Sequence, residues 1–245
     1  MKKLIILLSL LFLSYTSEAQ LWFDLGLKGG VGSGIAMNKT INDDGRFNPS
    51  AGFNYFFGGK FGINYGHYVG ITCDVDYGAY KYGFQQAEVP GKPDTESYKF
   101  TMAYNSINVM PMFRFTKDAS YLEVGPQFQF VRNPSIEDEA YPGSAPSGDY
   151  ISSRLTGLVF GFGAHMLGNE VISLMMGLRF NYVLSDLTAD DWVDSSFPFN
   201  NYPDITTHTK TNPINAQIVM EVNYSLGYFA KNTSGCGKRV AFLTF

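Results

Sequence analysis

The chain has 245 residues, with 18 Lys and Arg against 22 Asp and Glu, and a formal net charge of −4. This balance excludes binding to nucleic acid through a basic surface, and no nucleic-acid partner is expected. Aromatic residues make up 16% of the chain and there are 26 glycines, a composition more usual for a β-barrel than for a helical protein. No segment of the length needed for a transmembrane helix follows the N-terminal region, and we expect one folded domain.

The N-terminus predicts an exported protein. Lys2 and Lys3 precede the apolar run Leu4 to Leu13, and the small residues Ser17 and Ala19 follow. A basic start, a short apolar run and small residues at the −3 and −1 positions define a secretory signal peptide. We therefore predict that residues 1–19 are a signal peptide cleaved after Ala19, and that residues 20–230 form the barrel and 231–245 a C-terminal tail.

Alternating apolar and polar residues predict eight strands in the mature chain. In chain order they cover 22–32, 51–64, 68–84, a hairpin over 104–131 with its turn at 117–120, 153–167, 171–185 and 213–230. Polar, glycine-rich or proline-rich stretches between them predict long loops at 32–49, 85–97, 132–152 and 186–212, whereas 65–67, 117–120 and 168–170 are tight turns.

Long and short connections alternate, which places all long loops at one end of the strands and all short turns at the other. Outer-membrane barrels have this asymmetry, with short periplasmic turns and long outside loops. An even number of strands puts both chain ends on the periplasmic side. The predicted fold is therefore an all-β, eight-stranded antiparallel up-and-down transmembrane β-barrel.

The two faces of the strands decide which side meets lipid. In the second strand of the hairpin, Leu122, Val124 and Phe128 alternate with Glu123 and Gln127. The interior of an eight-stranded barrel has room only for side chains that fill it, and the bulky apolar row is too large to fit there. We expect this row to face lipid. A lipocalin-like soluble barrel with the reverse arrangement is the alternative.

Several short segments resemble the outer-membrane β-barrel family of the Bacteroidetes that is often called PorT-like. The resemblance extends over the mature chain and rests on the Ala19-Gln20 junction, Gly26 to Gly30, Asn108 to Pro111 and Tyr121 to Pro126. It implies an outer-membrane barrel with a link to protein secretion. It also implies that the terminal segment around Val240, Phe242 and Phe245 is an assembly signal for the barrel-insertion machinery.

Charged residues on the polar face are the candidate site residues. They are Asp24, Lys28, Lys60, Asp74, Asp76, Arg114, Glu123, Arg179 and Glu221. Because unpaired buried charge is expensive, we expect these four cations and five carboxylates to pair with one another and to fill the lumen as a polar network. A narrow ion path through the lumen is the alternative interpretation.

Catalytic and metal sites are not expected. The histidines His67 and His165 have no metal-ligand partner at close spacing. Ser195, His208 and Asp204 could form a hydrolytic triad, but they lie in one long loop, and a triad needs fixed geometry. No cofactor is predicted, and we expect the chain not to be an enzyme.

Two cysteines and the loop carboxylates complete the candidates. Cys73 shares the apolar face of its strand and should point to lipid, so we expect it and Cys236 to remain free thiols. Acidic residues of the predicted outside loops should be solvated charge. They are Asp43, Asp44, Glu137, Asp138, Glu139, Asp190, Asp191 and Asp194.

The expected function is a structural or interaction role in the outer membrane, linked to secretion or adhesion. Expected partners are the lipid bilayer and lipopolysaccharide, the barrel-insertion machinery, and an unidentified protein at the outside loops or periplasmic turns. A narrow solute or ion channel is the second hypothesis, and a lipid-modifying outer-membrane enzyme is the third.

Overall fold

A computed structural model describes residues 21–65, 68–87, 89, 91, 97–140, 148–169, 171–192, 209–231 and 240–241. The predicted signal peptide lies outside these residues. So do His67 and the predicted triad residues Ser195, Asp204 and His208, together with Cys236 and Asp194.

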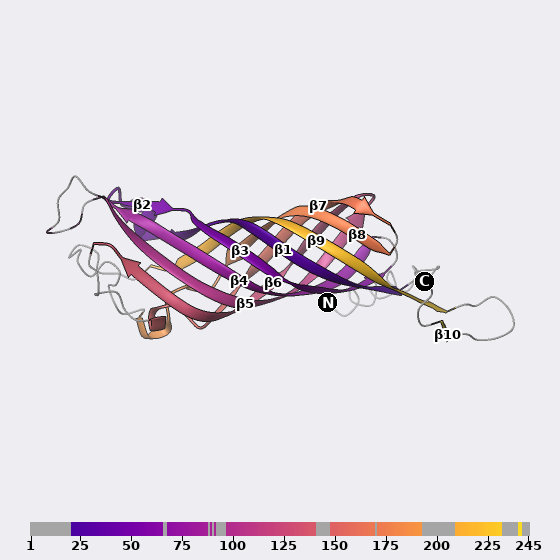
Figure 1. The fold of residues 1–245 in the computed structure, drawn as a ribbon. Helices are drawn as coiled ribbons and strands as arrows, with labels where there is room; N and C mark the ends of the chain where they lie inside the picture. The colour runs from indigo at the N-terminus through magenta and orange to yellow at the C-terminus, as the bar shows by residue number, and fades with distance from the viewer. Residues whose placement is uncertain are drawn as a thin grey trace, which may run out of the picture.

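Eight long antiparallel strands form a closed barrel (Figure 1). Their bounds are β1 Leu21–Asn38, β3 Gly52–Tyr65, β4 Val69–Gln86, β5 Tyr98–Lys117, β6 Ser120–Asp138, β7 Arg154–Gly168, β8 Ile172–Val183 and β9 Thr211–Lys231. Each strand pairs with the next, and β1 closes the ring by pairing with β9 from Leu21↔Phe229 to Asn38↔Thr211. The predicted up-and-down barrel is confirmed.

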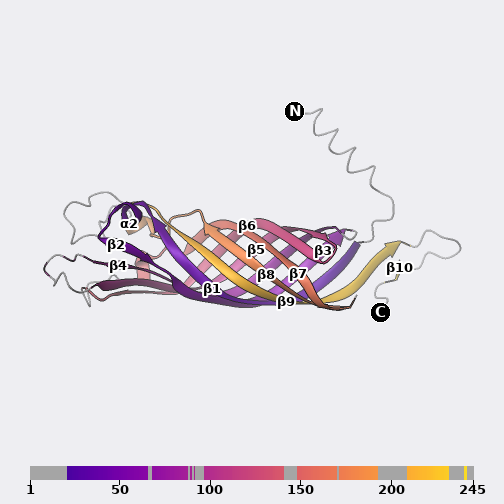
Figure 2. The ribbon, with the colours of Figure 1, turned by 90° about the horizontal axis from the view of Figure 1, so that it is seen from above.

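Long and short connections alternate around the barrel as predicted. Residues 66–68, 118–119 and 169–171 join strands at one end, and the other four connections, which are longer, lie at the opposite end. The start of β1 and the end of β9 lie together at the short-turn end (Figure 2). Among the described residues no helix has the length and apolar character needed to cross a membrane.

The stretch 32–49 is more ordered than the predicted loop. β1 continues to Asn38, and helix α2 (Lys39–Asp43) and strand β2 (Phe47–Ser50) follow. The Asn38 side chain caps α2 by accepting hydrogen bonds from the backbone N–H groups of Thr40 and Ile41. A Cβ at Gly32 would lie 2.0 Å from the Ala216 carbonyl oxygen. Gly32 therefore permits close strand contact rather than marking a loop.

Smaller elements lie at both ends of the barrel. The 3₁₀ helices η1 (Gly148–Tyr150) and η2 (Asp190–Trp192) belong to the long connections, where Ile151 and Thr188 form an isolated β-bridge. At the other end β10 (Val240–Ala241) pairs with the end of β9. Phe242 and Phe245 of the predicted assembly signal lie outside the described residues.

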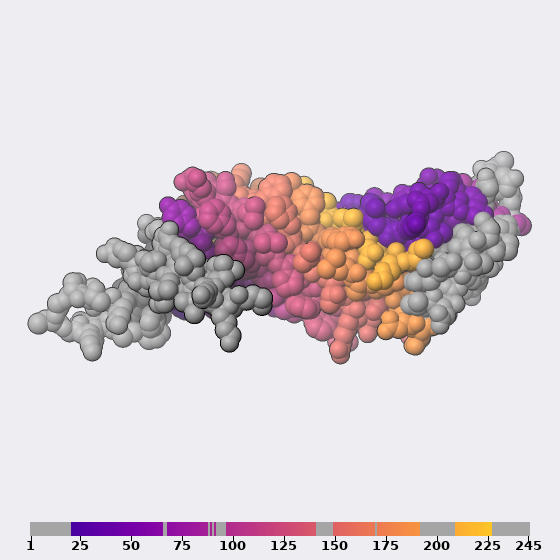
Figure 3. Space-filling model, turned by 180° about the vertical axis from the view of Figure 1, so that it is seen from behind, coloured from indigo at the N-terminus to yellow at the C-terminus, as the bar shows by residue number. Residues whose placement is uncertain are grey.

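Side chains alternate between an apolar exterior and a polar interior through the middle of the barrel. In β6 the exposed fractions of Leu122, Val124 and Phe128 are 40–44%, whereas Glu123 and Gln127 are at most 2% exposed. Cys73 of β4 is a free thiol on the outward row. Seen from behind, the strands' side chains form a continuous wall between the two ends (Figure 3). The apolar exterior is the arrangement expected of a lipid-embedded barrel.

This pattern inverts toward the long-loop end, which the sequence analysis did not foresee. In β4 the inward residues Tyr80, Tyr82 and Phe84 are at most 3% exposed, and the outward neighbour Lys81 is exposed. Apolar residues inside and a charge outside are the arrangement of a water-soluble protein. The strands therefore continue beyond the lipid-facing surface, and the expectation of a wholly polar lumen is wrong at this end.

Candidate functional site

All nine predicted lumen charges lie inside the barrel, each at most 6% exposed. They come from β1, β3, β4, β5, β6, β8 and β9. Ion pairs connect all nine into one network that runs across the lumen. Residues distant in sequence are brought together because each occupies an inward position of its strand.

Glu221 of β9 is the most connected carboxylate. Arg114 donates to it through two nitrogens, at 2.7 and 2.8 Å, and Lys60 approaches to 2.7 Å. Lys28 lies 3.1 Å away, and the Asn223 amide donates a hydrogen bond of 2.7 Å. Three cations thus share one buried carboxylate, a geometry that compensates its loss of hydration.

Glu123 of β6 and Asp74 of β4 extend the network through their ion pairs with cations of β1, β5 and β8. Glu123 lies 2.7 Å from Arg114, 3.3 Å from Arg179 and 3.4 Å from Lys28. Asp74 pairs with Lys28 at 2.6 Å and also with Arg179. Arg114 therefore bridges Glu123 and Glu221, and Arg179 bridges Asp74 and Glu123. These ion pairs tie five strands, β4, β5, β6, β8 and β9, together in the centre of the barrel.

Asp24 and Asp76 lie at the edges of the network and are held less tightly. Lys60 is 3.4 Å from Asp24, which also accepts a 3.1 Å hydrogen bond from Asn64. Asp76 is 3.5 Å from Arg179 and accepts a 2.6 Å hydrogen bond from Asn108. The set holds five carboxylates and four cations, so one negative charge is in excess when all are ionised.

Aromatic rings and a glycine complete the packing around the two arginines. The Arg114 guanidinium lies 4.5 Å from the centre of the Tyr121 ring, and Arg179 lies 5.0 Å from that of Phe56. β7 supplies none of the nine charges. A Cβ at its Gly161 would come within 2.7 Å of the Glu123 Cγ, so the glycine leaves the space that this side chain occupies.

A layer of amides separates the ion network from the long-loop end. Asn54 donates to Asn215 at 2.8 Å and accepts from Gln217 at 3.1 Å, and Gln217 in turn accepts from Asn181 at 3.2 Å. The Tyr82 hydroxyl donates to Asn215 at 2.9 Å. The Tyr82 hydroxyl therefore connects this layer to the aromatic residues above it.

Above the amides, buried apolar side chains close the lumen. We call this cluster the apolar cap; it comprises Ala36, Ile41, Phe47, Tyr80, Tyr82, Phe84, Phe100, Met102, Tyr104, Val131, Tyr150, Ile151, Leu155, Val183 and Leu187. Phe84 stacks on Phe100 with ring centres 4.7 Å apart, and Tyr80 stacks on Tyr104 at 5.5 Å. The inward parity of Asp74 and Asp76, continued along β4, identifies three of its aromatic members, Tyr80, Tyr82 and Phe84.

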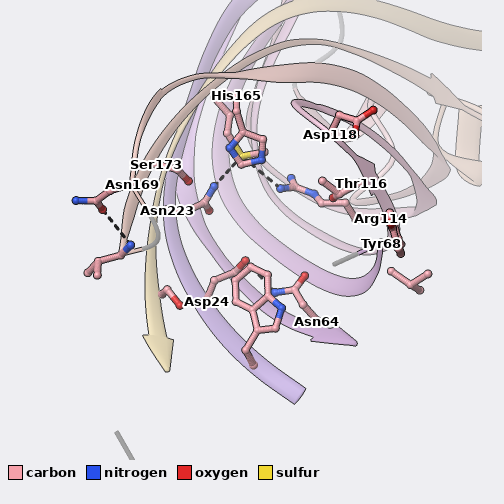
Figure 4. Close-up of a pocket in the computed structure, with 15 residues that line it drawn as sticks. Asp24, Asn64, Tyr68, Arg114, Thr116, Asp118, His165, Asn169, Ser173 and Asn223 are labelled. Atoms are coloured by element: carbon pink, nitrogen blue, oxygen red, sulfur yellow. Dashed lines mark hydrogen bonds between the residues drawn. The ribbon is translucent and has the colours of Figure 1, made fainter. Parts of the chain in front are cut away.

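A cavity of about 490 Å³ lies at the short-turn end. Asp24, Asn64, Arg114, His165 and Asn223 are among its lining residues, and Figure 4 shows them around the barrel mouth. His165 is the register partner of Met175, whose sulfur accepts a 2.9 Å hydrogen bond from Asn223. The cavity thus reaches from the short turns to the ion network.

The described residues hold no cluster of three or more His, Cys, Asp or Glu arranged to bind a metal ion. Among the loop acids, Asp44 pairs with Arg46 at 2.6 Å, and hydrogen bonds from Arg46 lower the pKa of the Asp44 carboxyl. Glu139 accepts a hydrogen bond from the backbone N–H of Lys99. The remaining described acids of the predicted loops lie in α2, β6 and η2.

A closed ring of strands with an apolar exterior and a charged interior defines a transmembrane β-barrel. A family model described as an outer membrane protein beta-barrel domain matches residues 18–189. The chain belongs to this family, and it is a protein of the bacterial outer membrane. A comparison with curated proteins gives no match.

Solved structures of outer-membrane proteins are similar in fold. Neisserial surface protein A (NspA) is 14% identical with a TM-score of 0.42, and the match covers 81% of this chain and 96% of that one. OprG from Pseudomonas aeruginosa is 10% identical with a TM-score of 0.38, covering 82% and 95%. The outer membrane protease OmpT from Escherichia coli is 8% identical, also with a TM-score of 0.38, covering 86% and 99%.

Proposed function

We propose that this chain is a non-conducting, non-catalytic barrel that holds an interaction surface at its long-loop end. The observation that carries the proposal is the apolar cap, which lies beyond the ion network and is continuous with the elements of that end. A barrel built only to pass solutes needs an open, wettable interior. Here the ion network, the amide layer and the apolar cap fill the interior, and the cap includes residues of α2 and β2.

The cap supports this role because it fixes the elements that would meet a partner. Ile41 of α2 and Phe47 of β2 are 3% exposed, and Phe47 packs edge-on against Phe84 of β4. Tyr150 of η1 belongs to the same cluster. Binding then requires little ordering of these segments, which lowers the entropic cost of association.

Conductance in planar bilayers tests the closed interior. We expect the purified barrel to give no discrete current steps above the leak of the bilayer, whereas an open porin inserted under the same conditions does so. Steps of uniform size that scale with the amount of barrel would contradict the proposal. They would favour a narrow channel, for which the cavity at the short-turn end is the supporting observation.

Site-specific photo-crosslinking in intact cells tests the interaction surface. Crosslinking residues placed at Lys39, Asn42 or Lys210 sample the long-loop end, and matched residues at Lys117 or Asp118 sample a short turn; all five positions are exposed. We expect one protein adduct of constant mass from the first group, lost when loop 186–212 is shortened. Equal adducts from both ends, or none from the long-loop end, would refute this part of the proposal.

The PorT-like resemblance makes secretion the finer form of this proposal, with a component of an export pathway as the partner. A lipid-modifying enzyme is the remaining alternative. Its candidate residues Ser195, Asp204 and His208 lie outside the described residues. Turnover of radiolabelled phospholipid or lipid A by the purified protein, abolished by His208→Ala, would overturn the non-catalytic proposal.

A further inference from the structure

The apolar exterior ends at one level along four neighbouring strands. The outward row of β4 passes from Tyr77 through Ala79 to Lys81, and that of β5 from Ile107 to Asn105. On β6 Phe130 is followed outward by Arg132. At this level the interior changes from amides to aromatic residues, as described above. The inversion of both faces marks where the wall leaves lipid and enters the aqueous boundary.

Cations gather at this boundary. Arg154 begins β7 two residues from Thr156 and four from the lipid-facing Leu158, so it occupies the corresponding outward position there. The pairs Asn105↔Arg132 and Phe130↔Arg154 place the two arginines on adjoining strands. We call Lys81, Arg132 and Arg154 the basic arc. At a strand spacing of about 4.8 Å it extends around roughly 14 Å of the barrel wall.

A notch of about 230 Å³ lies at the Lys81 end of the basic arc. It is bordered by Phe53 on the lipid side and by Lys81, with Asn105 and Asn133 between them. The β5–β6 register shifts between Ala103 and Asn105, and Asn133 adopts a φ of 46°. A non-glycine residue in this conformation is uncommon. The notch therefore coincides with a local irregularity of the β5–β6 pair.

Within the part of the chain that the structure describes, the basic arc differs from the lumen cations in having no ion-pair partner. Lys28, Lys60, Arg114 and Arg179 are all buried and paired. Lys81, Arg132 and Arg154 are exposed, and within the described residues none of them forms an ion pair. Three unpaired cations at a lipid boundary are complementary to anionic headgroups rather than to the acyl chains.

We propose that the basic arc binds the phosphate-bearing headgroup of an outer-leaflet lipid. Lys81, Arg132 and Arg154 face the phosphate, Asn105 at the notch donates hydrogen bonds, and the acyl chains lie along the apolar surface that Phe53 and Phe130 share with the rest of the exterior. The inference rests on outer-membrane localisation and on these residues. It is independent of the proposed interaction surface and of conduction.

Native mass spectrometry of the full-length mature barrel in detergent provides the test, with bis-phosphorylated lipid A as the probe. We expect the variant Lys81→Gln/Arg132→Gln/Arg154→Gln to bind more weakly by about fivefold for each removed charge, or roughly 100-fold in all. The control Lys99→Gln/Lys117→Gln/Lys210→Gln removes three other exposed cations and should bind as the parent protein does. Added salt should weaken parent binding and leave the arc variant nearly unchanged.

Two comparisons decide the outcome. Lipid A stripped of its phosphates should bind the parent protein and the arc variant equally and weakly. Equal affinity of the parent protein for both forms of the lipid would overturn the proposal, as would a control variant that loses as much affinity as the arc variant. Because all six substitutions lie on exposed positions, the circular-dichroism spectra of both variants should match that of the parent.

Discussion

Glu221→Gln removes the charge of the most connected lumen residue while keeping the size of its side chain. In the parent protein this carboxylate meets Arg114 and Lys60 at 2.7 Å each and Lys28 at 3.1 Å. The substitution leaves the two closest cations with one carboxylate partner each, since Arg114 keeps Glu123 and Lys60 keeps Asp24 at 3.4 Å. Both cations remain buried, and each has lost an ion pair of 2.7 Å.

The cost follows from those contacts. Charge-assisted hydrogen bonds contribute about 1.5–3 kcal/mol each, and breaking one partner of a buried ion pair costs about 3–5 kcal/mol. We therefore expect the free energy of unfolding to fall by about 3–5 kcal/mol. The measurement is reversible urea unfolding of the barrel in lipid vesicles, followed by tryptophan fluorescence.

A matched control shows whether the loss of stability depends on the burial of the charge or on the Glu→Gln change alone. Glu137→Gln makes the same chemical change at an exposed position of β6, and its effect should stay within about 0.5 kcal/mol. If Glu221→Gln unfolds at the same urea concentration and with the same slope as the parent, the argument that this network stabilises the barrel is wrong.

Three further predictions concern the rest of the described chain. Phe100→Ala should destabilise the barrel by about 3–5 kcal/mol in the same assay, because Phe100 is fully buried; an equal loss for the lipid-facing Phe128→Ala would contradict this. Gly161→Val should lower the yield of folded barrel, measured by far-ultraviolet circular dichroism in vesicles, because a Cβ would meet Glu123 at 2.7 Å; an unchanged yield would refute the packing argument. An NMR titration should place the pKa of Asp44 below the ordinary value of an aspartate carboxyl, and Arg46→Ala should raise it; the stabilisation from the ionised pair is then fully present above the ordinary carboxyl pKa and is lost as the pH falls through the lowered pKa.

The number of strands, their directions and the side on which each side chain lies could be predicted, because each depends on the local alternation of apolar and polar residues. A period of two assigns Leu122 and Glu123 to opposite faces whatever the rest of the chain does. The volume of a small barrel then decides which face is inside. The same parity selects the nine lumen charges. It cannot say which cation meets which carboxylate, since that depends on the stagger between strands such as β5 and β9, which are not neighbours.

A rule that places polar residues inside and apolar residues outside along the full length of every strand does not predict the apolar cap. Polar-in and apolar-out holds only where the exterior is lipid. At Tyr80, Tyr82 and Phe84 the exterior is aqueous, and the rule reverses. Lys81 between two tyrosines was the available signal. The glycines of 32–49 favour a loop for a similar reason. Glycine is common in turns, but Gly32 lies in a strand, where its lack of a side chain permits close contact with the neighbouring strand.

The central claim is that the apolar row faces lipid and that a packed interior is hidden from it. Paramagnetic broadening of methyl NMR signals by a spin-labelled lipid, with the barrel in nanodiscs, measures this directly. We predict strong broadening for the outward methyl groups of Leu122, Val124 and Ile218, and none for those of the buried Met110 and Val159. Broadening of Met110 and Val159 with Leu122 and Val124 left sharp would contradict the account.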